Sequence, residues 1–169
     1  MDLRLRPYRD DDEAAARAGN EIMKDDDFMF LLYWDPDASW ADFLRGEEIR
    51  RRGENLGPEQ VRSVQLAAEV HGQLVGRSSI RFELNEFLEH RGGHIGYGVL
   101  PPFRRMGYAS EILRQSLVIA RADGVERILM FCDDDNVGSA AVIERCGGQL
   151  EAVITVDPGE PDFRKYWID

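Results

Sequence analysis

The 169-residue sequence predicts one α/β domain over residues 1–169, in which a mixed sheet carries helices on both faces. Three observations predict this class. Short runs alternate apolar with polar residues, as strands do, while other runs repeat apolar residues with a helical period. A strand–helix–strand unit over 94–132 indicates a parallel crossover, whereas 61–84 reads as an antiparallel hairpin. The predicted order is β-α-α-β-β-β-α-β-α-β-β, and no repeat or linker divides the chain.

The first half of the chain is predicted to hold a strand, two helices and a hairpin. Its elements are a strand over 3–9, a helix over 12–24 capped by Asp10, Asp11 and Asp12, a helix over 40–53 that ends near Gly53, and strands over 61–70 and 74–84. The connection over 25–40, DDDFMFLLYWDPDASW, is acidic and aromatic and contains a proline turn.

The second half is predicted to alternate strands and helices before a final strand pair. Its elements are a loop over 85–93, a strand over 94–100, a helix with apolar or small residues at 109, 112, 113, 116, 117 and 120, a strand over 127–132, a helix over 137–148 that Gly147 and Gly148 end, and strands over 149–156 and 163–168 joined by a turn at 157–162.

Composition limits the classes of partner. The formal net charge is −11 and the sequence pI about 4.8, which argues against nucleic acid or an anionic membrane and fits a cationic substrate. We find no apolar stretch that would span a bilayer, and the charged N-terminus predicts no secretory signal, so we expect a cytoplasmic protein. Cys132 and Cys146 are expected to be buried free thiols, and the histidine spacing predicts no metal site.

The stretch PPFRRMGYASEI over 101–112 has the features of an anion site. The first N–H groups of a helix lack internal partners and carry partial positive charge. Gly107 lets the backbone approach a ligand closely, and Arg104 and Arg105 add cationic donors that suit phosphate. On this stretch alone, an exposed turn with two solvated arginines is an equal alternative.

Two spaced motifs resemble those of the GCN5-related N-acetyltransferases, the GNAT superfamily. VLPPFRRMGYASEIL resembles the loop of that family that binds the acyl-CoA pyrophosphate, with Arg104, Gly107 and Ala109 at its three key places. DNVGSAAVIERCGG resembles the second family signature. The positions that match the second signature are Asn136, Ser139, Glu144, Arg145, Gly147 and Gly148. The resemblance covers nearly the whole chain and is strongest between residues 93 and 150.

The resemblance implies an acyl-CoA N-acyltransferase fold that binds acetyl-CoA without a metal. In that family the strand matching 94–100 splays from the strand matching 127–132, and the pantetheine arm lies in the gap. The residues that the resemblance places at the cofactor are Val99, Leu100, Arg104, Arg105, Met106, Gly107, Tyr108, Ala109, Asn136 and Ser139. Asn136 also suits a helix N-cap, and the two roles can coexist.

The sequence departs from the family at its usual acid and base. Many members carry a tyrosine as general acid where this chain has Ile143. Members with a base on the central strand place it where Gly93 and Ile95 stand, and neither side chain can serve. His94 has the opposite strand parity, which favours a structural role.

Three other residues are the candidates for proton transfer. Tyr97 shares the strand parity of Ile95, Glu83 lies near the end of the preceding strand, and Tyr166 lies on the last strand. Each has an ordinary alternative, since strand-end carboxylates are usually exposed and strand aromatics usually belong to the core. The missing tyrosine and the missing strand base also leave open a non-catalytic acyl-CoA-binding or sensing domain.

The expected function is transfer of acetyl from acetyl-CoA to a primary amine of a small molecule or peptide. The resemblance implies an acceptor site between the connection 25–40 and the last strand pair. Acidic groups beside aromatics in that connection could receive a cationic amine, although a charge cluster with core packing is an equal alternative. The oligomeric state stays open, with a homodimer among the assemblies considered.

Overall fold

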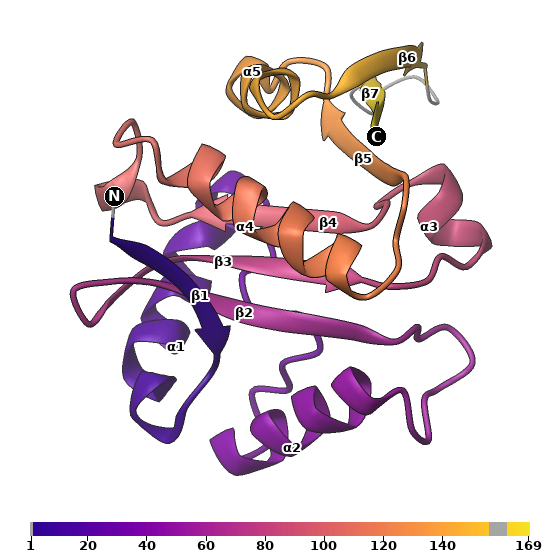
Figure 1. The fold of residues 1–169 in the computed structure, drawn as a ribbon. Helices are drawn as coiled ribbons and strands as arrows, with labels where there is room; N and C mark the ends of the chain where they lie inside the picture. The colour runs from indigo at the N-terminus through magenta and orange to yellow at the C-terminus, as the bar shows by residue number, and fades with distance from the viewer. Residues whose placement is uncertain (1, 156–161) are drawn as a thin grey trace.

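The strands form two antiparallel sheets instead of one continuous sheet (Figure 1). The computed structural model describes residues 2–155 and 162–169, so the turn predicted at 157–162 lies outside the described residues except for Asp162. The first sheet has the order β1-β2-β3-β4 and the second the order β5-β7-β6. The strands are β1 (Leu3–Pro7), β2 (Ser63–Val70), β3 (Gln73–Arg81), β4 (Ile95–Val99), β5 (Ile128–Asp133), β6 (Gln149–Ile154) and β7 (Phe163–Ile168). The predicted α/β class is confirmed, and the sheet divides between β4 and β5.

The α-helices follow the predicted order with one addition, α3, and three short 3-10 helices (η1, η2 and η3) accompany them. They are η1 (Asp10–Asp12), α1 (Glu13–Ile22), η2 (Met23–Asp26), α2 (Trp40–Arg52), α3 (Glu86–His90), η3 (Pro101–Phe103), α4 (Tyr108–Ala122) and α5 (Val137–Arg145). The loop predicted over 85–93 is wrong in part, because α3 lies within it. The Asn85 side chain accepts the N–H of Leu88 at 2.9 Å and starts this short helix, a local capping bond that the apolar pattern does not reveal. None of the described helices, in 2–155 and 162–169, has the length and apolar character needed to cross a membrane.

Helices cover both faces of the first sheet, as predicted (Figure 1). Alternate residues of a strand point to opposite faces. Leu66 and Ile80 therefore join the apolar face of α4, while Ala67 joins a cluster with α1 and α2. This second cluster is aromatic: Trp40 and Phe43 stack with their ring centroids 4.8 Å apart. Both faces of the sheet are thus covered, and its two edge strands are β1 and β4.

The two sheets meet at one point, the start of β4 and of β5. The N–H of His94 donates to the carbonyl of Leu129 at 2.8 Å, and the N–H of Leu129 donates to Nδ1 of His94 at 2.9 Å. His94 therefore has the structural role that its parity predicts, and burial lowers its pKa, which favours the neutral ring. From this contact, residues 95–97 of β4 and residues 130–132 of β5 line the same cavity, so the two strands run in the same general direction as they separate.

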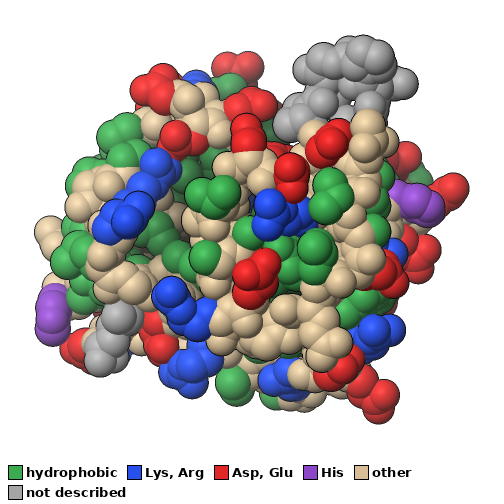
Figure 2. Space-filling view, turned by 90° about the horizontal axis from the view of Figure 1, so that it is seen from above, with side chains coloured by type: hydrophobic (Ala, Val, Ile, Leu, Met, Phe, Trp, Pro, Cys, Tyr) green, Lys and Arg blue, Asp and Glu red, His purple; other side chains and the backbone are tan. Residues whose placement is uncertain are grey.

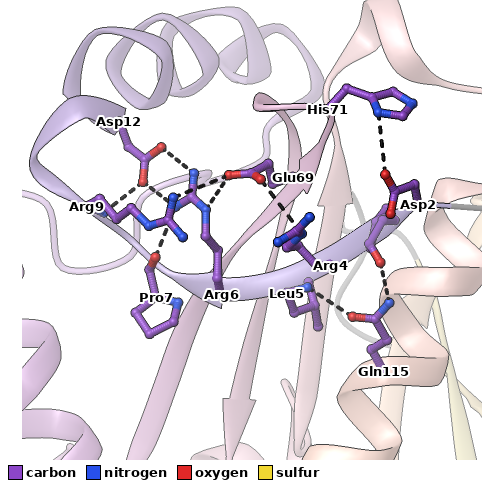
Figure 3. Close-up of polar contacts among 11 residues, drawn as sticks. Asp2, Arg4, Leu5, Arg6, Pro7, Arg9, Asp12, Glu69, His71 and Gln115 are labelled. Atoms are coloured by element: carbon purple, nitrogen blue, oxygen red, sulfur yellow. Dashed lines mark hydrogen bonds and ion pairs between the residues drawn. The ribbon is translucent and has the colours of Figure 1, made fainter.

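A buried charge network ties β1 to β2 and to the start of α1 (Figure 3). The Arg6 guanidinium donates to both carboxylate oxygens of Asp12, at 2.6 and 2.8 Å, and through Nε to Glu69 at 2.6 Å. All three side chains are buried. The Asp12 carboxylate also accepts the N–H of Arg9 at 2.7 Å, so it orders the turn before α1.

Replacing Arg6 by methionine is expected to lower the free energy of unfolding by about 3 kcal/mol, because Asp12 is left as a buried carboxylate without its cation. Arg4→Met on the same strand is the matched control. The Arg4 side chain is 65% exposed and its Nε lies 3.9 Å from the Glu69 carboxylate, so its removal should cost less than about 1 kcal/mol. Urea unfolding of both variants checks this, and equal losses would contradict the network's role.

The pH dependence of the same variant provides a second readout. Burial raises the pKa of Asp12, but its bonds from Arg6 and from the Arg9 N–H lower that pKa by more, so the net shift is downward. A lowered pKa stabilises the fold above the unfolded value of 3.8 and loses that contribution as the pH falls through the folded value. Wild-type stability should therefore fall below about pH 4, and the fall should be smaller in Arg6→Met.

Candidate active site

The separation of β4 from β5 opens a cleft of about 980 Å³. One wall is the end of β4 with η3 and the loop to α4; the other is α5 with the turn before it. The start of α4 and residues of η2 complete the lining. The cleft is thus built where the sequence predicts a splayed strand pair.

The start of α4 presents free N–H groups to this cleft. The first helical bond runs from the N–H of Glu111 to the carbonyl of Gly107, so the N–H groups of Tyr108, Ala109 and Ser110 precede the helical pattern. All three residues line the cleft. Gly107 has φ +82° and Arg105 φ +65°, left-handed conformations that turn the backbone sharply at the helix start. This geometry suits an anion.

The two loop arginines have different surroundings. Arg104 donates through Nε to the Val99 carbonyl at 3.0 Å and pairs with Asp26 at 2.5 Å, which fastens the end of β4 to η2. The backbone N–H of Arg104 donates to the Pro101 carbonyl at 3.3 Å. Arg105 is exposed and has no ion pair with another described residue. Both arginines line the cleft, and Arg105 is the one without a carboxylate partner among the described residues.

The edge of β4 directs alternate backbone groups into the gap. The N–H of Leu100 donates to Val75 at 2.9 Å, so this N–H belongs to the sheet. N–H groups alternate in direction along an antiparallel strand, so those of Tyr97 and Val99 point away from β3 and toward the gap. Val99 lines the cleft, while the Leu100 side chain is buried in the cluster beneath α1.

Tyr97, Asn136 and Ser139 come together at the inner end of the cleft. The Tyr97 hydroxyl lies 3.0 Å from the hydroxyl of Ser139. Asn136 caps α5 by accepting the N–H of Ser139 at 3.0 Å, so its expected capping role is confirmed. Burial raises the pKa of Tyr97, which keeps the phenol protonated at neutral pH.

Several predicted site residues lie elsewhere. Glu83 is 64% exposed, with a carboxylate oxygen 3.9 Å from Arg62. Tyr166 is fully buried in the core, and its hydroxyl donates to Glu144 at 2.8 Å. The Met106 side chain is 55% exposed. Among the three candidates for proton transfer, Tyr97 is the one that lines the cleft.

A smaller cavity of about 240 Å³ adjoins the cleft. Five residues line both spaces. These shared residues are Phe28, Tyr97, Asp133, Asn136 and Ser139. Sequence reasoning missed Phe28 and Asp133 as individual site residues. For Asp133 a signal existed, since it ends the buried strand β5 just before the α5 turn.

A family model for the acetyltransferase (GNAT) domain matches residues 2–149 of the chain. The chain belongs to the GNAT family of acetyltransferases. The GNAT resemblance predicted from the two motifs is thereby confirmed.

Solved structures of other GNAT proteins share this fold at low sequence identity. The microcin C7 self-immunity acetyltransferase MccE, in complex with acetyl-CoA and AMP, is 18% identical, with a TM-score of 0.70 over 98% of this chain and 91% of that chain. The ribosomal L7/L12 α-N-protein acetyltransferase RimL, with coenzyme A, is 19% identical, with a TM-score of 0.69 over 99% and 93%. Mutant forms of the spermidine/spermine N-acetyltransferase SpeG from Vibrio cholerae are 16% identical, with a TM-score of 0.66 over 98% and 93%. No curated protein matches the chain by sequence.

The thiols of this GNAT domain are poor nucleophiles. Cys132 lines the smaller cavity, and burial raises its pKa to about 11. A thiol with such a pKa is protonated at neutral pH, which disfavours an acyl-cysteine intermediate.

Ile143, where many family members have tyrosine, is fully buried in the core. Within 2–155 and 162–169, no group of three or more His, Cys, Asp or Glu could hold a metal ion.

Proposed function

We propose that this GNAT domain transfers the acetyl group of acetyl-CoA to a primary amine by direct attack. The observation that carries the proposal is the cleft itself, which leads from the start of α4 along the free edge of β4 to Tyr97. The N–H groups of Tyr108, Ala109 and Ser110, with the Arg105 guanidinium, suit the pyrophosphate. The N–H of Val99 suits the pantetheine arm, and the thioester then lies near Tyr97.

Phosphate binding here is local and does not follow the overall charge of the chain. On the face that Figure 2 shows, acidic side chains are interspersed with Lys, Arg and apolar groups, so the net charge of −11 is not gathered into one patch there. At the loop, Asp26 neutralises Arg104, while Arg105 adds its charge to the positive end of α4. A polyanion therefore meets favourable charge at this helix start.

The transfer requires loss of one proton from the amine. The amine nitrogen attacks the thioester carbonyl, a C–N bond forms, the C–S bond breaks, and the electron pair leaves on the CoA sulfur. A lysine-like ammonium has a pKa of about 10.4, so deprotonation at pH 7 costs about 4.6 kcal/mol. Tyr97 cannot supply that base, since its pKa is raised. Its phenol has a pKa above that of a thiol, about 8.5, so it can stabilise the departing thiolate by donating a hydrogen bond without giving up its proton, and water takes the proton that the amine loses.

The acceptors named for two structural neighbours support an amine substrate. RimL is described as an α-N-protein acetyltransferase and SpeG as a spermidine/spermine N-acetyltransferase, so nitrogen receives the acetyl group in both.

Both cysteines of this chain are free, as is usual in a reducing compartment, which supports a cytoplasmic site of action.

One assay separates the enzyme from the alternative of a non-catalytic acyl-CoA-binding or sensing domain. The protein is incubated with acetyl-CoA and a panel of primary amines while free thiol is followed. Thiol release that depends on an amine, with the acetylated amine identified by mass spectrometry, supports the transferase. The observation that favours the alternative is Ile143, buried where an acid would stand. Binding of acetyl-CoA without turnover on any amine would establish the sensing domain.

Tyr97→Phe is expected to lower kcat about tenfold, the cost of one hydrogen bond of about 1.4 kcal/mol to a developing charge. The KM for acetyl-CoA should change by less than about twofold, because the ring stays in place. Steady-state kinetics with saturating amine check this split. Tyr33→Phe, on an exposed ring that stacks with Arg50, is the control and should leave both constants unchanged. An unaltered kcat in Tyr97→Phe would show that the Tyr97 hydroxyl does not donate a hydrogen bond to the departing thiolate.

A further inference from the structure

We infer that Arg77 is a positioning residue for the transfer reaction, because it holds residues 28–32 so that the Phe28 ring lies at the junction of the cleft and the smaller cavity. This inference rests on the proposed function and adds a residue to the same site. Arg77 itself lines neither space. It lies opposite Ala67 in the register of β3 and β2, on the face of the sheet that α1 and α2 cover, and it acts through Phe28.

Arg77 is a buried cation without an opposite charge beside it. The residue is 3% exposed, and it forms no ion pair with a carboxylate of the described residues. Burial lowers its pKa to about 10, so the guanidinium stays charged at neutral pH. A buried charge of this kind is costly unless other bonds compensate for it. The contacts of Arg77 therefore indicate why a cation stands there.

The Arg77 guanidinium contacts three backbone carbonyls and one aromatic ring. Its Nε donates to the Phe30 carbonyl at 3.1 Å, and its Nη2 donates to the Met29 carbonyl at 2.7 Å. Its Nη1 donates to the Gly96 carbonyl of β4 at 3.1 Å, so one side chain joins the segment to the edge strand. Its Cζ lies 4.5 Å from the centroid of the Phe28 ring, a cation–π distance. Arg77 thus holds both the backbone of the segment and the ring.

Two further side chains complete the hold on residues 28–32. This segment contains no helix or strand, so its backbone groups need partners from elsewhere in the fold. Asn20 of α1 accepts the N–H of Leu31 at 3.0 Å, and Gln65 of β2 accepts the N–H of Leu32 at 3.1 Å. Bonds from α1, β2 and β3 therefore order the segment that carries Phe28.

Phe28 lies where the two spaces join. It lines both the cleft and the smaller cavity, as Tyr97 and Ser139 do. A Cβ atom at Gly98 would lie 2.6 Å from the Phe28 ring, so the ring packs directly against the backbone of β4. In the proposed reaction the thioester lies near Tyr97, which places Phe28 beside the reacting atoms. A shift of about 1 Å in such a wall can cost about 100-fold in rate.

Arg77→Met is expected to lower kcat at least about tenfold and to leave the affinity for acetyl-CoA within about threefold. The start of α4 is formed by other residues, so most of the donor binding is kept. The acceptor is whichever of spermidine, 2-phenylethylamine and trialanine the wild type acetylates fastest, at saturation, and isothermal titration gives the affinity. An unaltered kcat, or a loss of acetyl-CoA affinity as large as the loss of kcat, would overturn the inference.

Two other arginine variants separate positioning from stability and from charge. Arg6→Met removes a buried arginine from β1, at the opposite edge of the sheet, and should destabilise the protein without changing kcat. An equal loss of kcat in Arg6→Met would trace the effect to stability and overturn the inference. Arg77→Lys keeps the charge, but an ammonium group lacks the planar fork that reaches two carbonyls and the ring, so kcat should fall here too. This variant carries the test if Arg77→Met does not fold by circular dichroism, and wild-type kcat in it would also overturn the inference.

Phe28→Ala tests whether Arg77 acts through the ring. It should lower kcat by about the same factor as Arg77→Met, and the double variant should lose no more than about twofold beyond either, because residues that act as a unit are not additive. Multiplied losses in the double variant would show that Arg77 acts independently of Phe28, against the inference. Failure of the wild type to acetylate any of the three amines, with acetyl-CoA bound, would instead overturn the proposed function itself.

Discussion

Gly107→Asp is expected to weaken acetyl-CoA binding about 100-fold, whereas Gly107→Asn should weaken it by less than about fivefold. The two side chains have the same shape and both tolerate the left-handed conformation at φ +82°, so the pair differs only in charge. Two unit charges about 6 Å apart at an effective dielectric constant of about 20 repel by about 2.8 kcal/mol, which is about 100-fold in affinity.

The aspartate variant should remain folded, which makes the binding result decisive. A negative charge at a helix N-terminus stabilises the helix, so the charge that weakens ligand binding should stabilise α4. Isothermal titration with acetyl-CoA gives the affinities, and circular dichroism with thermal unfolding gives the fold. Equal affinities for the two variants would show that no anion lies at the start of α4, and the proposed pyrophosphate position would then be wrong. Higher salt should narrow the difference, because the repulsion is partly exposed.

The sequence was most informative where the chemistry is local. The loop before α4 could be predicted because the glycine, the two adjacent cations and the helix start all lie within six residues of the sequence. The helices and most strands follow from periodicity, and the start of α4 at Tyr108 agrees with the motif. The cap formed by Asn136 was equally accessible, since the capping amide and the N–H that it accepts lie three residues apart. These features need no knowledge of the tertiary fold.

Features that depend on distant partners could not be predicted. Arg104 and Arg105 are adjacent and identical in the sequence, yet Arg104 is neutralised by Asp26, 78 positions earlier in the chain. Phe28 reaches the site only because Gly98 leaves room for its ring. Tyr166 was a reasonable candidate on its strand, but it is buried in the core and its hydroxyl donates a hydrogen bond to Glu144. In each case tertiary packing decides which member of a chemically suitable set faces the cleft.

Gly93→Ala is expected to lower the free energy of unfolding by about 4 kcal/mol and to move β5 away from β4 where the cleft begins. This effect is large for the addition of one methyl group. Gly93 has φ +64°, and a Cβ atom there would lie 2.4 Å from the Leu129 carbonyl oxygen. That oxygen accepts the N–H of His94 in the contact that joins the two sheets. The left-handed conformation alone costs an alanine about 1–2 kcal/mol, and displacement of a buried backbone adds a similar or larger amount.

Gly124→Ala separates these two costs. Gly124 has φ +95° and a Cβ atom there would meet nothing within 4 Å, so the variant carries the backbone strain without the collision. Urea unfolding should place its loss near 1 kcal/mol, against about 4 kcal/mol for Gly93→Ala. Acetyl-CoA affinity should fall only in Gly93→Ala, because β5 must move away from β4 at the point from which the gap opens. Equal losses of stability with unchanged affinity would mean that strain at Gly93, rather than the approach of the two sheets, accounts for the glycine.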